Sequence, residues 1–231
     1  MNRLTLIPIL ALAAWGCNQK AAAPSGTEEP KTDAPKQEQK PAEPKAVPIK
    51  FNHDGARYYG FTNPNPVKYR LIQGGAAVGE GTSTIQFKSG TDAAQTFSVT
   101  RDGSLEMLGT ESVELNAKGV FSVSTSSGTY DSPVMELPAD VAPGKTWTQD
   151  TGLNVGTGKV KMKLSLKAVG EETVKTDLGD KTALKVTGTG SMVQAGKTFK
   201  IDATAWYVKD FGFVRQIIKS DAQSTTVEVA K

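Results

Sequence analysis

The chain has very few residues suited to metal binding, disulfide formation or nucleophilic catalysis. It contains one cysteine and one histidine in 231 residues. A lone cysteine cannot form a disulfide within its own chain, and a zinc site needs several histidine or cysteine ligands. The carboxylate spacing of a calcium-binding loop is also missing. The sequence therefore predicts no metal site and no cofactor. Ser-His-Asp catalysis would have to use His53, which we expect to be a polar surface residue.

The charge balance gives no sign of a nucleic-acid partner. The whole chain carries 27 basic and 24 acidic residues, a formal net charge of +3. A nucleic-acid-binding domain normally concentrates positive charge on one face, and so small an excess predicts no such partner. Beyond the first few residues, no apolar run is long enough to suggest a transmembrane helix.

The first residues have the composition of a secretory leader. Arg3 supplies positive charge, and Leu4 to Trp15 is a run of 12 uncharged residues. A bilayer-spanning helix needs about 20 residues, whereas a signal h-region needs only 7 to 15. The run ends in Gly16-Cys17, and at this point the chain resembles bacterial lipoprotein precursors.

The lipoprotein resemblance implies a specific N-terminus. A signal peptide of residues 1–16 is removed, and the sulfur of Cys17 carries a lipid that attaches the protein to a membrane. Because the residue after the cysteine is Asn18 and not aspartate, the resemblance favours the outer membrane over the inner membrane. Two alternatives remain open: cleavage by ordinary signal peptidase after Ala21-Ala22-Ala23, or an incidental thiol in a discarded leader.

Residues 17–47 are predicted to be a disordered linker. Positions 18 to 46 contain no Val, Leu, Ile, Met, Phe, Tyr or Trp, and five lysines balance five acids. Such a segment cannot bury enough apolar surface to offset its ordering entropy. We therefore expect a solvated spacer, with a partner motif or cell-wall contact as the alternative.

Residues 48–231 form the predicted folded domain, in which apolar residues recur with a period of two. Val160, Met162, Leu164, Leu166 and Ala168 alternate with polar residues, as they do in a half-buried strand. The other strand candidates are 83–88, 95–101, 119–124, 130–137 and 199–207, with glycine- or proline-containing turns between them. Because ten or more antiparallel strands must close, curl or split, we predict an all-β domain. The favoured form is a curled antiparallel sheet, a half-barrel or barrel, and the alternative is a two-sheet β-sandwich.

The C-terminal 90 residues carry a second resemblance. Pro143-Gly144-Lys145-Thr146-Trp147, Gly170-Glu171-Glu172-Thr173-Val174, Ala205-Trp206-Tyr207 and Gly212-Phe213-Val214 occur in order. Together they resemble exported bacterial β-domains related in style to the TapB-like proteins. Such domains are similar to half-barrels that carry lipids and lipoproteins across the periplasm, which is an analogy of fold only.

Three further patterns are candidate binding sites. Residues 191–198 nearly match a phosphate-binding loop, but a strand follows where that loop needs a helix, so a hairpin turn is the better interpretation. Lys159, Lys161, Lys163 and Lys167 form a basic stripe, either a solubilising face or a contact for anionic lipid or polysaccharide. Five aromatic residues are candidates for the core or for lining a ligand cavity: Trp147, Trp206, Tyr207, Phe211 and Phe213.

The sequence favours a non-enzymatic function. No pair of carboxylates is marked out by its spacing, so no catalytic residue is predicted. The favoured function is a lipid-anchored lipoprotein of the cell envelope with a structural or binding β-domain. The alternative is a half-barrel carrier of acyl chains, lipids or lipoproteins. The expected partners are the membrane, reached through the N-terminal lipid, and an apolar small molecule or an envelope protein.

Overall fold

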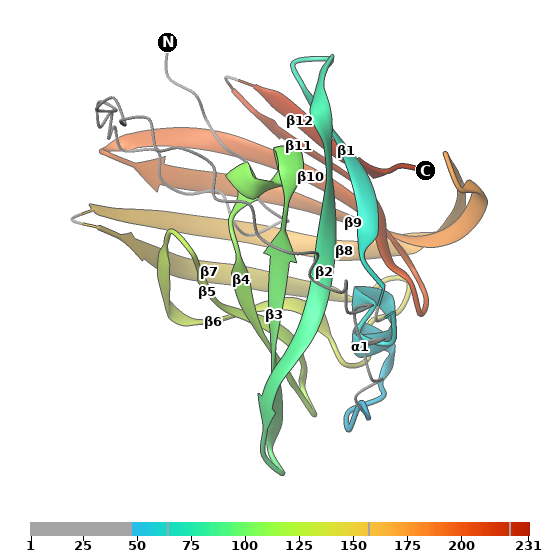
Figure 1. Cartoon of the computed structure of the whole chain (residues 1–231). Helices are drawn as coiled ribbons and strands as arrows, with labels where there is room; N and C mark the ends of the chain where they lie inside the picture. Colours follow the sequence, from blue (N-terminus) through green and yellow to red (C-terminus); the bar gives the residue numbers. More distant parts are fainter. Residues whose placement is uncertain (1–47, 64, 157, 222) are drawn as a thin grey trace, which may run out of the picture.

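The computed structural model describes residues 48–231, except residues 64, 157 and 222. The predicted signal peptide, Cys17 and linker therefore lie outside the described residues. The described part contains twelve β-strands, one short α-helix and one 3-10 helix, η1 (Figure 1). In chain order these elements are α1 (Asp54–Tyr59), β1 (Val67–Gln73), β2 (Ala76–Gly90), β3 (Ala94–Arg101), η1 (Gly103–Leu108), β4 (Glu111–Asn116), β5 (Gly119–Thr125), β6 (Gly128–Pro138), β7 (Thr146–Val155), β8 (Gly158–Thr176), β9 (Gly179–Gln194), β10 (Lys197–Val208), β11 (Gly212–Ser220) and β12 (Ser224–Val229).

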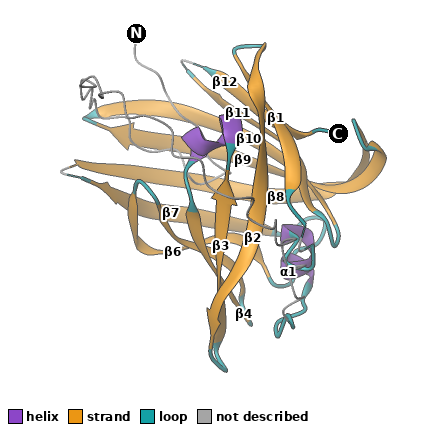
Figure 2. Ribbon diagram, in the orientation of Figure 1, coloured by secondary structure: helices purple, strands orange, loops and turns teal. Residues whose placement is uncertain are grey.

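The strands form one closed antiparallel barrel. Each strand pairs with its neighbour in sequence, and β1 closes the sheet by pairing with β12, with Tyr69 opposite Val229. In the view of Figure 2 the long strands of the two sides cross at a steep angle, which gives the barrel a flattened look. The prediction of an all-β curled antiparallel sheet is confirmed in its barrel form, and the two-sheet sandwich is not adopted.

Alternation along the strands explains which residues face inward. In β8, Val160, Met162, Leu164 and Leu166 are buried while the intervening lysines are exposed. A period of two places successive side chains on opposite faces of a strand, so the sequence pattern alone sets the inner and outer surfaces. The β9–β10 hairpin turns at Ala195 and Gly196, whose φ values are 49° and 75°. Two left-handed residues are typical of a tight hairpin turn, which confirms the prediction for residues 191–198.

Both tryptophans of the domain are buried, but in different places. Trp147 lies opposite Leu166 across the β7–β8 pair and belongs to the apolar core. Trp206 lies opposite Lys185 across the β9–β10 pair and belongs to the same core cluster, and its indole N–H donates to Glu172 of β8 at 2.7 Å. This hydrogen bond holds the pKa of the Glu172 carboxyl below its usual range. Of the two alternatives that the sequence leaves open for these tryptophans, the structure therefore shows the core.

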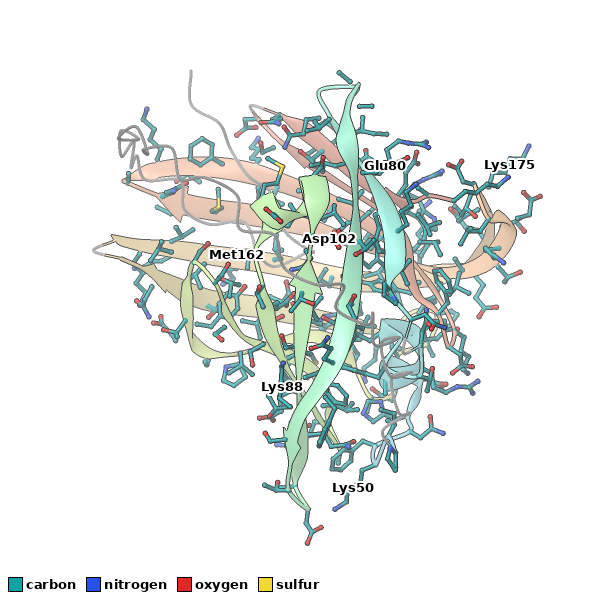
Figure 3. The ribbon with its side chains drawn as sticks, in the orientation of Figure 1. Lys50, Glu80, Lys88, Asp102, Met162 and Lys175 are labelled. Atoms are coloured by element: carbon teal, nitrogen blue, oxygen red, sulfur yellow. The ribbon has the colours of Figure 1, made fainter. Side chains whose placement is uncertain are left out.

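The extended β8–β9 hairpin is fastened to the outside of the barrel by polar contacts. Figure 3 shows Lys175 near its end, away from the barrel wall. The Arg215 guanidinium donates to the Lys175 carbonyl at 2.9 Å, and Arg70 donates to Asp177 at 2.9 Å. Arg70 and Arg215 are also within 3.7 Å and 3.2 Å of Glu228. These exposed ion pairs position the hairpin but each contributes little stability.

Of all neighbouring strands in the barrel, β6 and β7 have the fewest paired residues in the described part of the chain. Among the described residues, two pairs join these strands: Thr129 with Asn154 and Tyr130 with Leu153. Further along, the Gln149 side chain donates to the Met135 carbonyl at 2.7 Å in place of a backbone ladder. The indole N–H of Trp147 and the side-chain oxygen of Gln149 are buried without a hydrogen-bond partner in the described part of the chain.

Helix α1 lies across one end of the barrel. It contacts β5 and β6 on one side and β10 and β11 on the other, strands that are not neighbours in the sheet. His53 caps its N-terminus, since Nδ1 accepts from the Ala56 N–H at 3.0 Å while Nε2 lies 2.9 Å from the Asn116 carbonyl oxygen. Gly60 ends the helix with φ of 93°, and a Cβ there would lie 2.6 Å from the Phe211 carbonyl oxygen. Glycine therefore allows the helix to close against the β10–β11 turn.

Candidate functional site: a polar pocket inside the barrel

A small pocket opens between α1 and the inner faces of the barrel strands. Its lining combines aromatic rings with buried polar groups, and comes from α1, β1, β2, β3, β6, β10, β11 and the adjoining turns. The volume of the cavity is about 50 Å³. This volume corresponds to a few water molecules, so most of the barrel interior is filled by side chains.

Arg101, which lines the pocket, forms a buried ion pair with Glu111, which does not line it. The guanidinium lies 3.2 Å from the Glu111 carboxylate, and the two side chains are 5% and 0% exposed. Arg101 also donates to the Gly109 carbonyl at 2.8 Å. Charges removed from water must be paired and hydrogen-bonded, and this pair meets both conditions.

A second carboxyl, that of Glu136, joins this pair through Ser122. The Ser122 hydroxyl is within hydrogen-bonding distance of Glu111 and lies 2.6 Å from Glu136. One hydroxyl has a single proton and can donate to only one of two carboxylates. The second contact requires a proton on a carboxyl group. Burial, followed by the nearby charge of Glu111, raises the pKa of Glu136 well above its usual value, so Glu136 is the group that holds this proton.

Three tyrosines surround the two carboxyls and stay neutral. Burial raises the pKa of the Tyr59, Tyr130 and Tyr207 hydroxyls well above the ordinary value, and the charge of Glu111 raises it further. Arg101 is therefore the only charged partner that the described residues supply to these two acids. The site has two carboxyls and one guanidinium, so its net charge is zero only when one carboxyl is protonated.

The Glu136→Gln variant is expected to gain stability relative to the wild type as the pH rises. Below about pH 4.5 the Glu136 carboxyl is protonated in both the folded and the unfolded chain, so it contributes no pH dependence. Above that pH the unfolded chain releases the proton while the folded chain keeps it. Stability of the wild type then falls by up to about 1.4 kcal/mol per pH unit until the folded pKa is reached. Glutamine has no such proton.

Urea unfolding of both chains at pH 5 and pH 8 measures this effect. The stability difference, variant minus wild type, should grow between the two values. A difference that is the same at both values would show that Glu136 does not retain a proton in the folded chain.

The other residues singled out in the sequence have mostly structural positions. Tyr207, Phe211 and Phe213 line the pocket, whereas Trp147 and Trp206 do not. His53 is a half-buried helix cap and not a freely exposed surface residue, because both ring nitrogens have partners. The lysine stripe faces outward on β8, where Lys159 and Lys163 lie 2.5 Å and 3.4 Å from Asp131 and Asp150. Pairing with acids on the same face favours the solubilising interpretation.

Sequence reasoning did not identify the buried cluster of Arg101, Glu111, Ser122 and Glu136. A signal was available, because Glu111 alternates in register with Val113 and Leu115, and Glu136 with Val134. Charged residues at inward positions of a strand are uncommon and indicate a paired interior site. The carboxyls of Glu111 and Glu136 come together from strands 25 residues apart, a proximity that depends on β5 lying between them.

The described residues also define what the site does not contain. They hold no group of three or more His, Cys, Asp or Glu side chains placed to bind a metal ion. No α-helix in the same part of the chain is long and apolar enough to cross a membrane. Of the two carboxyls in the cluster, only Glu136 lines the pocket.

Comparison with solved structures shows the fold. The chain is similar to a protein from Bacteroides fragilis described as exported and as having a YmcC-like fold. The TM-score is 0.53 and the identity 12%, over 72% of this chain and 93% of that one. It is also similar to a protein from Parabacteroides distasonis described as a lipoprotein, with a TM-score of 0.53 and 9% identity, over 73% of this chain and 95% of that one. No family model and no curated protein matches the sequence. At this identity the likeness defines the YmcC-like barrel as the fold class.

Proposed function

We propose that this protein is a lipid-anchored lipoprotein of the bacterial cell envelope whose barrel binds a small ligand without catalysing a reaction. The observation that carries the binding function is the pocket, which concentrates polar groups in an otherwise filled barrel. The leader, Cys17 and the linker supply the export and the anchor, and Asn18 favours the outer membrane. The two structural neighbours, one described as exported and the other as a lipoprotein, agree with this proposal.

A non-enzymatic role fits the position of the two carboxyls. General acid–base catalysis by a carboxyl pair needs both groups to reach the substrate. Glu111 has no exposed side-chain surface and is paired with Arg101, so only Glu136 faces the pocket. One accessible acid, held protonated, suits hydrogen bonding or charge pairing with a ligand better than hydrolysis.

The carrier of acyl chains is the weaker alternative. A long acyl chain needs an enclosed apolar cavity of several hundred cubic ångströms. The barrel interior beside the pocket is packed with side chains that are almost fully buried, among them Leu71, Leu115, Leu164 and Leu184. The pocket volume favours a ligand of a few non-hydrogen atoms.

Replacing Cys17 with serine is expected to release the protein from membranes. Each buried methylene of an acyl chain contributes about 0.8 kcal/mol, so two or three chains hold a protein almost permanently. Fractionation of cells, together with the intact mass of the wild-type protein, measures this. The wild type should carry added acyl mass and sediment with membranes, while Cys17→Ser should not. A variant that still sediments, with a wild type that has no acyl mass, would refute the anchor.

A further inference from the structure

The pocket is lined by polar side chains that a ligand could reach. Tyr207 and Gln216 are 6% and 5% exposed, and both line the pocket. The Tyr207 hydroxyl and the Gln216 side-chain amide are not among the fully buried atoms that lack a partner in the described residues, so these polar atoms are open to the pocket. Two polar groups that face one small space can both hydrogen-bond to a polar ligand placed in it.

The charge of the pocket identifies the kind of occupant. The groups that face Glu136 are Glu111 from β4, Ser122 from β5, Arg101 from β3, and three neutral tyrosines from α1, β6 and β10. Arg101 is already paired with Glu111. An anionic ligand would add negative charge to a site that already holds an excess carboxyl. A cationic ligand would let Glu136 ionise and would leave the site neutral.

The aromatic lining favours the same kind of ligand. Tyr69 and Phe213 stack with ring centroids 4.5 Å apart, and Tyr59, Tyr207 and Phe211 add further rings around the space. Aromatic faces attract cations through the ring quadrupole, most strongly where water is excluded. The space for a few water molecules admits an ammonium group with a short carbon chain, and not a large ligand.

We propose that the pocket binds the primary ammonium group of a small organic amine, which replaces the proton of Glu136. Its three N–H donors match three acceptors: the Glu136 carboxylate, the Gln216 side-chain oxygen and the Tyr207 hydroxyl oxygen. Binding below the pH at which empty Glu136 ionises releases one proton to solvent. This inference deepens the proposed binding function by naming the ligand class.

Isothermal titration calorimetry of the full, acylated chain in detergent micelles tests the inference, with ethylammonium chloride as the probe. Titrations at pH 7 in two buffers of different ionisation enthalpy count the protons released, and about one is expected per ligand bound. Affinity should rise with pH by up to tenfold per unit until Glu136 ionises without ligand. Tetramethylammonium, which has no N–H donors, should bind at least tenfold more weakly.

Two variants separate the site from the fold. Glu136→Gln should lose at least tenfold in affinity and lose the pH dependence, because a neutral amide cannot balance the ammonium charge. Tyr207→Phe keeps the ring, removes one acceptor, and should lose affinity by a smaller factor. The matched control is Glu114→Gln, on β4 and outside the pocket lining, which should bind as the wild type does. A thermal midpoint for each variant confirms that it is folded.

Three results would overturn the inference. Acetate or neutral N-ethylacetamide could bind as tightly as ethylammonium, Glu136→Gln could bind it with unchanged affinity, or none of the probes could bind. Any of these results would refute the amine site, whereas the anchored lipoprotein would still be tested separately by membrane fractionation. A chain that binds ethylammonium but carries no lipid on Cys17 would instead refute only the anchor.

Discussion

Replacing Arg101 with methionine should lower the free energy of unfolding by about 3–5 kcal/mol, the usual cost of breaking a buried ion pair. The guanidinium is 5% exposed and lies 3.2 Å from Glu111, whose side chain is completely buried. Methionine fills similar volume but leaves the Glu111 carboxylate without its counter-charge. Urea unfolding at pH 7 measures the loss.

The double variant Arg101→Met/Glu111→Gln is the control for this prediction. It removes both charges, so its stability should recover toward the wild type and exceed that of Arg101→Met alone. If the single variant unfolds at the wild-type urea midpoint, or if the two substitutions add without recovery, the ion pair does not stabilise the barrel interior as described.

Replacing Trp147 with alanine should also cost about 3–5 kcal/mol, a large part of a typical domain stability of about 5–15 kcal/mol. Trp147 is 9% exposed and packs in the core next to β6 and β7, which have few paired residues between them. A cavity at this position removes packing where few backbone hydrogen bonds hold the wall. The urea midpoint and its slope measure the effect.

Trp147→Phe is the matched control, because it keeps an aromatic ring and removes the indole N–H. That N–H is buried without a partner among the described residues, so the substitution removes an unsatisfied donor. The phenylalanine variant should therefore lose much less stability than the alanine variant. Equal losses in the two variants would mean that the indole N–H is satisfied in solution.

The strands could be predicted because alternation is a local signal. Val160 to Ala168 reads as a strand from the sequence alone, and its burial in the barrel follows the same alternation. The strand β4, Glu111–Asn116, was missed because Glu111 and Glu114 weaken its apolar pattern. The acid that obscures this strand is the one that pairs with Arg101 in the interior.

Closure of the barrel and the site could not be predicted in the same way. Pairing of β1 with β12 joins segments about 150 residues apart, and no local pattern specifies such a pairing. The pocket depends on that closure, since Tyr69 from β1 and Gln216 from β11 line it together. The sequence identified Tyr207, Phe211 and Phe213 as cavity candidates, but the polar half of the lining becomes recognisable only once the strands are placed.

Whether Glu136 carries a proton in the ligand-free protein is the most direct test of the binding site described above. Infrared difference spectroscopy of the wild type against Glu136→Gln at pH 7 detects the carbonyl band of a protonated carboxylic acid. The band should be present in the ligand-free wild type and absent from the variant. It should disappear from the wild type when ethylammonium is added, as the carboxyl ionises beside the bound cation. A ligand-free wild type with no protonated-carboxyl band would contradict the account, since Glu136 would then be ionised in the empty pocket.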